Sequence, residues 1–136
     1  MIVRLLRAIP VRSRRVGFAV YAVVLATGTH WPALTLVPDP GFRLDLLVHL
    51  AAFAAWTFLL AGCEWFGPVV SRRNVGWCAA ISAAYAALDE ATQSLPGVNR
   101  TVLWSDLIAN WGGVAAAVAW LAVAGRHGDR KPNGPA

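Results

Sequence analysis

Polar side chains that could move protons interrupt the apolar stretches of this chain. Asp89 and Glu90 are adjacent acids within an apolar run, and His49 carries the side chain whose charge changes near neutral pH. A carboxyl group that is buried beside a second acid is suited to general acid–base chemistry. Acids at membrane depth are also costly, and they usually mark function. We therefore take Asp89, Glu90 and His49 as candidate catalytic residues.

Five further polar residues are candidates for holding a ligand. They are Asp45, Gln93, Arg100, Asp106 and Asn110. The planar guanidinium of Arg100 could grip a carboxylate or a phosphate through two hydrogen bonds. A structural interpretation stands beside this one. Arg100 would then pair with the neighbouring acids, His49 would be a hydrogen-bonded residue between helices, and the two amides would join helices.

The spacing indicates neither a metal site nor a nucleophile. His49 and the acids could offer ligands to a hard or borderline ion, but they form no compact ligand motif. Cys63 and Cys78 show no CxxC or metal spacing, and no serine or cysteine is paired with a base in a nucleophile signature. We expect both cysteines to be packing residues, and we expect no metal and no cofactor.

The composition is that of a membrane protein. Of the 136 residues, 57% are hydrophobic and 14% are charged, whereas soluble domains carry about 25% charged residues. Apolar stretches at about 16–37, 44–62, 75–95 and 102–124 are each near the roughly 20 residues that span a bilayer. We predict an all-α integral membrane bundle of four transmembrane helices. Its single domain covers residues 16–124, between a basic cytoplasmic segment (1–15) and a disordered cytoplasmic tail (125–136).

Basic residues fall mainly on one side of these spans. They precede the first, separate the second from the third, and follow the fourth, while only Arg43 and Arg100 lie in the other connections. The positive-inside rule therefore places both termini in the cytoplasm of a multi-pass plasma (inner) membrane protein. This asymmetry explains the net charge of +5 without a nucleic-acid partner. A basic start before an apolar run also fits a signal peptide, but we find no convincing cleavage site and expect the first helix to be retained.

The predicted topology brings the candidate residues to one depth. The second, third and fourth helices and the last outer loop each place polar groups just beneath the extracytoplasmic surface. Closing the helices into a bundle would gather these groups into one pocket that opens to that side. A membrane lipid or a lipid-linked envelope component is the partner that such a pocket suits.

Small residues follow the last polar position. Gly112 and Gly113 each begin a small-xxx-small face with an alanine four residues later, and such faces let helices approach closely. Packing within the chain is the simpler interpretation, and a homodimer through the Gly112/Gly113 face is the alternative.

The same polar residues carry a family resemblance. The pattern consists of D-x-x-x-H at 45–49, Y-x-x-x-D-E-x-x-Q at 85–93, R-T at 100–101, D-x-x-x-N at 106–110, and Gly112. It resembles the VanZ-like family and covers the second to fourth predicted helices. Family members often have a Lys after the first Asp, where this chain has Leu46. The resemblance implies a small integral membrane protein. It also implies an envelope context, because the founding member of the family is linked to teicoplanin resistance.

Three functions are compatible with these observations. The first is a protein that binds or modifies a cell-envelope component from the outer face, with a role in glycopeptide-antibiotic resistance. The second is a non-enzymatic structural or regulatory membrane protein whose polar cluster fixes helix packing. The third is a small transporter or proton pathway. It is the least favoured, because the inner halves of the second and fourth helices offer almost no polar side chains.

Overall fold

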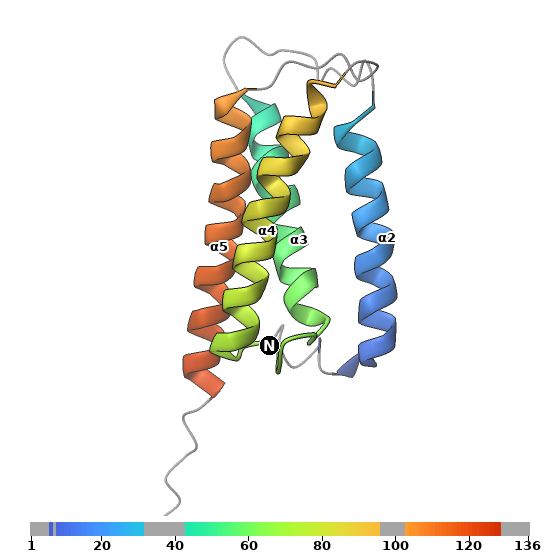
Figure 1. The fold of residues 1–136 in the computed structure, drawn as a ribbon. Coiled ribbons are helices and arrows are strands. Elements are labelled where there is room, and N and C mark those ends of the chain that lie inside the picture. The colour runs from blue at the N-terminus through green and yellow to red at the C-terminus, as the bar shows by residue number, and fades with distance from the viewer. Residues whose placement is uncertain (1–5, 7, 32–42, 96–102, 129–136) are drawn as a thin grey trace, which may run out of the picture.

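The computed structural model describes residue 6 and residues 8–31, 43–95 and 103–128. Over these ranges the chain is all-α, with the helices α2 (Val11–Thr29), α3 (Leu44–Gly62), α4 (Arg72–Gln93) and α5 (Trp104–Gly128). Successive helices run in opposite directions as a bundle, so α2 begins and α5 ends at the same end of the molecule (Figure 1). The prediction of an all-α chain with four helices is confirmed. Residues 129–136 of the expected tail lie outside the described residues.

The first long helix, α2, begins and ends at different residues from the apolar run that predicts it. The helix ends at Thr29, although the apolar run continues to about Val37. Pro32 explains this end, because proline has no N–H to donate and disfavours helical geometry at the residue before it. At the other end, residues 11–15 of the expected N-terminal segment belong to α2.

Arginines of α2 hold the C-terminal end of α3. The Arg14 Nη1 atom donates to the Gly62 carbonyl at 2.6 Å, and Arg15 Nε donates to the Cys63 carbonyl at 3.1 Å. Arg14 Nη1 also lies 3.4 Å from the Glu64 carboxylate. The last carbonyls of a helix have no partner within that helix. These basic residues therefore stabilise the fold as well as contributing to charge asymmetry.

The connection from α3 to α4 is organised by a buried asparagine. Asn74 Nδ2 donates to the carbonyls of Ala61 and Val69, at 2.9 and 3.1 Å, and its Oδ1 accepts from the Phe66 N–H at 3.3 Å. Ser71 caps the start of α4 by accepting from the Asn74 N–H at 3.3 Å. One side chain thus satisfies three backbone groups of a tight connection.

Both cysteines lie at this same end of the bundle, as free and fully buried thiols. Cys63 follows α3 directly, and Cys78 lies one turn after Asn74 in α4. Burial raises the pKa of the Cys63 thiol above its ordinary value, against the opposing effect of the nearby arginines. The thiol is therefore kept in its neutral, unreactive form.

Aromatic rings join three helices in the core. Trp56 of α3 stacks on Tyr85 of α4 with ring centroids 4.2 Å apart, and it packs edge-to-face with Phe18 of α2 with ring centroids 4.8 Å apart. The Tyr21 hydroxyl adds a hydrogen bond from α2 to the Ala52 carbonyl of α3 at 2.8 Å. These contacts fix α2 against the other helices.

A glycine allows α3 and α5 to pack closely. A Cβ atom at Gly113 would overlap the Leu50 carbonyl and lie 2.9 Å from the Ala54 backbone nitrogen. Ala117, one turn later, is also buried. The Gly113 face is thus used for packing within the chain. The Gly112 face is only half-buried, so a homodimer through it stays a prediction.

Two of the helices are suited to a membrane. The segments Leu44–Gly62 and Trp104–Arg126 are long and apolar enough to span one, and only 28% of the most apolar window of each is buried within the bundle. A core helix of a soluble protein that is equally apolar would be mostly buried. α2 and α4 do not meet the same criterion, since charged residues lie in both. The structure therefore favours membrane association.

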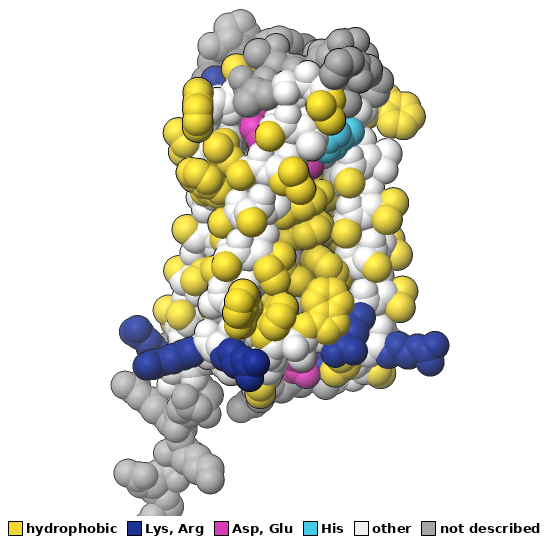
Figure 2. Space-filling view, viewed as in Figure 1, with side chains coloured by type: hydrophobic (Ala, Val, Ile, Leu, Met, Phe, Trp, Pro, Cys, Tyr) yellow, Lys and Arg dark blue, Asp and Glu magenta, His cyan; other side chains and the backbone are white. Residues whose placement is uncertain are grey.

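The charged side chains gather at the two ends of the bundle. Figure 2 shows most of the arginines in a band at one end together with an acidic side chain, further acidic and histidine side chains near the other end, and uncharged surface between them. In α5 this uncharged interval runs from Leu107 to Gly125, which corresponds to about 29 Å of helix. Its length is close to the roughly 30 Å hydrocarbon thickness of a bilayer.

Candidate functional site

The candidate residues within the described ranges lie at the end of the bundle opposite the arginine band, in two groups. The α2–α4 group contains Thr29, His30, Asp89, Thr92 and Gln93. The α3–α5 group contains Arg43, Asp45, His49, Ser105, Asp106 and Asn110. Glu90 lies between the two groups.

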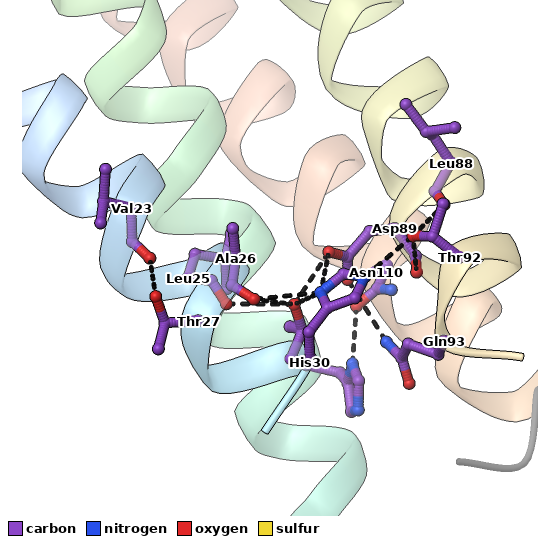
Figure 3. Close-up of polar contacts among 12 residues, drawn as sticks. Val23, Leu25, Ala26, Thr27, His30, Leu88, Asp89, Thr92, Gln93 and Asn110 are labelled. Carbon is purple, nitrogen blue, oxygen red and sulfur yellow. Dashed lines mark hydrogen bonds and ion pairs between the residues drawn. The ribbon is translucent and has the colours of Figure 1, made fainter. Parts of the chain in front are cut away.

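Asp89 is the centre of the α2–α4 group. Thr29 Oγ1 donates to Asp89 Oδ1 at 2.9 Å, and Gln93 Nε2 donates to Asp89 Oδ2 at 3.4 Å. His30 Nδ1 lies 3.8 Å from the same Oδ1, and His30 Nε2 lies 2.9 Å from the Thr92 hydroxyl. Figure 3 shows His30 and Asp89 approaching each other from α2 and α4. Both oxygens of the buried Asp89 carboxylate are therefore engaged by protein groups.

The α2 members of this group were not predicted from the sequence. The apolar run predicts a span that continues past Thr29 and His30, so that both would lie within it. Because α2 ends at Thr29, they lie at its end and reach Asp89. Pro32 was the available signal, since it predicts a helix end shortly before it. The hydrogen bond described for Gln93 stays within α4, so its predicted role of joining two helices stays a prediction.

His49 is the centre of the α3–α5 group. Its Nδ1 lies 3.0 Å from Asn110 Oδ1, and its Nε2 lies 3.5 Å from Asp106 Oδ2. The Ser105 hydroxyl donates to the other oxygen of Asp106 at 3.1 Å. Both ring nitrogens of His49 thus face oxygen atoms of α5. His49 is thus a hydrogen-bonded residue between helices, as the structural interpretation expects.

Asp45 has a different role from its neighbour His49. Its carboxylate accepts from Arg43 Nε at 3.1 Å and from Arg43 Nη2 at 2.8 Å, at the exposed start of α3. This hydrogen bonding raises the pKa of Arg43 above its ordinary value. Arg43 Nη2 also lies 3.9 Å from Asp106 Oδ1. Arg43 was not a predicted site residue, although an acid two positions away in the sequence could have indicated the pair.

Glu90 connects the two groups and the start of α5. Its Oε1 accepts from the Leu103 N–H at 2.9 Å, and its carboxylate is near enough to Asp106 and His49 to interact electrostatically with both. Asp89 instead faces α2. Adjacent residues of a helix point about 100° apart, so the expectation that the two acids need not share one environment is confirmed.

Two polar atoms in this region have no hydrogen-bond partner among the described residues. They are Glu90 Oε2 and Asn110 Nδ2, which belong to side chains that are 2% and 0% exposed. The first is an acceptor and the second is a donor. A buried polar atom left unpaired costs about 1–3 kcal/mol, so few such atoms occur in folded proteins. Their presence here distinguishes the α3–α5 side of the region from the fully engaged Asp89.

Arg100 lies outside the described residues, so its predicted role stays a prediction. Across the described ranges, no three His, Cys, Asp or Glu side chains are grouped so that they could hold a metal ion. Comparison of the chain with protein-family models, with curated proteins and with solved structures gives no match. The VanZ-like resemblance therefore also stays a prediction.

Proposed function

We propose that the chain is a VanZ-like protein that crosses the plasma (inner) membrane four times, with the arginine band on the cytoplasmic side. Two features support the membrane location: the apolar helices α3 and α5, and the uncharged middle of the bundle. The arginine band at one end supports the orientation. Exposed tryptophans support it too. Trp31 and Trp104 lie near one end and Trp65 and Trp77 near the other, as expected for side chains at the two membrane surfaces.

In this orientation, the polar region binds a polar group of a membrane lipid or a lipid-linked envelope component from the extracytoplasmic side. The observation that carries this proposal is that two buried atoms of the region, Glu90 Oε2 and Asn110 Nδ2, have no hydrogen-bond partner among the described residues. One can accept a hydrogen bond and the other can donate one, so together they suit a ligand with both a hydroxyl or amide and an acceptor oxygen. Arg100 is the proposed partner for an anionic part of the same ligand.

If the bound component is also modified, Glu90 is the best-placed proton carrier. One of its oxygens is unpartnered, whereas both Asp89 oxygens are held by Thr29 and Gln93. His49 is held between Asp106 and Asn110 and could receive or return the proton. Asp89 then positions α2 against α4 and does not touch the ligand.

The test compares Glu90→Gln with Glu64→Gln, which makes the same change at the opposite end of the bundle. The amide oxygen of the substituted side chain could still accept from the Leu103 N–H, so Glu90→Gln removes the ionisable group while keeping the helix connection. We expect cells producing Glu90→Gln to lose any teicoplanin tolerance that the wild-type chain confers, at an unchanged melting temperature in detergent. Glu64→Gln should keep it. A stable Glu90→Gln protein with full tolerance would refute the ligand role.

A structural role is the second candidate, and the hydrogen bonds between helices favour it. Thr29 to Asp89, His49 to Asn110, and Glu90 to Leu103 each connect two elements. In that case loss of tolerance across a set of variants should follow loss of melting temperature. The ligand role instead predicts that the two separate in Glu90→Gln.

A proton or solute pathway is the third candidate. Its support is that Ser82 Oγ and Trp56 Nε1 are also buried without a hydrogen-bond partner among the described residues, below the α2–α4 group. Trp56 stacks on Tyr85, which interacts with Asp89. Proton flux into proteoliposomes that depends on Ser82 would favour this candidate over the other two.

A further inference from the structure

A hollow of about 690 Å³ lies at the arginine end of the bundle, away from the polar region described above. It is bounded by the α3–α4 connection, the first turns of α4 and the last turns of α5. Its lining includes Arg72, Val75, Gly76, Ala122 and Arg126. The volume is in the range of sites that bind small molecules.

Two cationic side chains at this hollow have no acidic partner among the residues that the structure describes. The described residues place no carboxylate in an ion pair with Arg72 or Arg126, whereas Arg14 at the same end is paired with Glu64. Arg72 is the first residue of α4, where the helix N–H groups add partial positive charge. Arg126 lies in the last turn of α5, where the helix carbonyls partly balance it. Arg72 is therefore the stronger site for an anion.

Apart from Ser71, the other residues that line the hollow are apolar or glycine. Val70, Val75 and Ala122 line it, and a Cβ atom at Gly76 would have nothing within 4 Å. A ligand that fits must therefore combine an anionic head with hydrocarbon. At the level of the arginine band, next to the uncharged middle of the bundle, a phospholipid of the adjacent leaflet has both parts in the required order.

We infer that this hollow binds one anionic diacyl phospholipid of the cytoplasmic leaflet. Its phosphate lies at Arg72 and Arg126, and the acyl-chain carbons nearest the head group pack against Val75 and Ala122. The inference depends on the proposed membrane location of the chain. It is independent of any ligand role for Glu90 at the other end.

The first experiment is native mass spectrometry of the full chain, taken from micelles that contain equal amounts of phosphatidylglycerol and phosphatidylethanolamine. We expect the wild type to retain one phosphatidylglycerol selectively. Arg72→Gln should reduce this retention about fivefold, the effect of losing one basic contact with an anionic lipid. Arg126→Gln should reduce it less. Arg73→Gln is the matched control, because Arg73 is exposed and does not line the hollow.

A second variant removes space and leaves every charge in place. Gly76→Leu should fill the hollow and displace the lipid without a clash, and it should not lower the melting temperature, because leucine favours a helix more than glycine does. Gly17→Leu is its control, at another open glycine of an exposed helix face. Inorganic phosphate should not displace the lipid, since it offers no hydrocarbon. Displacement by phosphate would instead assign the site to a free anion and refute the inference that it binds a lipid.

Three further results would overturn the inference: equal loss in Arg72→Gln and Arg73→Gln, no preference for the anionic lipid, or full retention in Gly76→Leu. Glu90→Gln should retain the lipid fully. Retention there together with normal teicoplanin tolerance would refute the proposed ligand role of Glu90 and leave the lipid site standing, so the two failures can be told apart.

Discussion

At the scale of single residues, the main finding is that the adjacent acids Asp89 and Glu90 serve different helix pairs. Asp89 is satisfied by hydroxyl and amide donors, and its burial is the reason that it needs them. Glu90 accepts at one oxygen from the start of α5, and its other oxygen, which has no hydrogen-bond partner among the described residues, is the one that we propose to meet a ligand. Of the two, only Glu90 combines an unpartnered oxygen with a nearby histidine.

The role of Asp89 can be tested through its partner on α2. Thr29→Val keeps the shape of the side chain but removes the hydroxyl that donates to Asp89 Oδ1. We expect a fall of about 1–3 kcal/mol in the free energy of unfolding, because a buried acceptor loses a donor. Thr27→Val is the control, since the exposed Thr27 bonds only to a carbonyl of its own helix. Equal effects of the two variants, measured by denaturation in detergent, would show that the Asp89 contact contributes nothing.

The polar residues of α3, α4 and α5 could be predicted from the sequence because their helices are recognisable from it. Spacing of four residues places His49 one turn beyond Asp45, and Asn110 one turn beyond Asp106. Which atoms meet could not be predicted. Arg43 pairs with Asp45 because the two lie next to each other at the exposed start of α3. His49 contacts Asp106 and Asn110 instead. Spacing gives a shared face, and local competition between donors decides the pairs.

Among the helices, the predicted bounds are most accurate where the flanking charged residues and the length of the apolar stretch indicate the same helix ends. The bounds of α3 coincide with its apolar stretch at 44–62. The predicted first helix lies too far towards the C-terminus. The apolar run continues after Pro32, and the prediction assigns Arg12, Arg14 and Arg15 to a separate segment before the helix. Two of those arginines are helical residues that bond to the end of α3. Composition alone does not reveal that a basic residue of one helix donates hydrogen bonds to the C-terminal carbonyls of another.

The close packing of α3 on α5 gives a prediction at the scale of elements. Gly113→Ala would place a Cβ atom on the Leu50 carbonyl, which is backbone and cannot rotate away. The two helices must then separate, and we expect a loss of about 1–3 kcal/mol or more from overpacking. At Gly112 the nearest atom to a new Cβ is a Leu50 methyl at 3.7 Å, so Gly112→Ala should be tolerated. Thermal unfolding in detergent measures both, and similar melting temperatures would contradict the packing argument.

At the scale of the whole molecule, the two ends of the bundle differ in chemistry. One end gathers arginines around the helix ends and a hollow with apolar walls. The other end buries acids, amides and histidines between helices. An uncharged middle separates them, with large hydrophobic side chains exposed on its surface. This division fits a bilayer with anionic lipid at the arginine end and with the polar region facing the opposite side.

The proposed orientation can be tested with one residue type at both ends. Ser13 lies in the first turn of α2 and Ser94 directly after α4, and both are exposed. In a background with Cys63→Ala and Cys78→Ala, we expect a membrane-impermeant maleimide to label Ser94→Cys in intact cells. Ser13→Cys should be labelled only after the membrane is permeabilised, because the positive-inside rule places the arginine band in the cytoplasm. The reverse pattern would invert the proposed topology and move the Glu90 region to the cytoplasmic face. Labelling of neither variant until permeabilisation, with the protein in the soluble fraction, would refute the membrane location, and the lipid site at Arg72 would then be refuted with it.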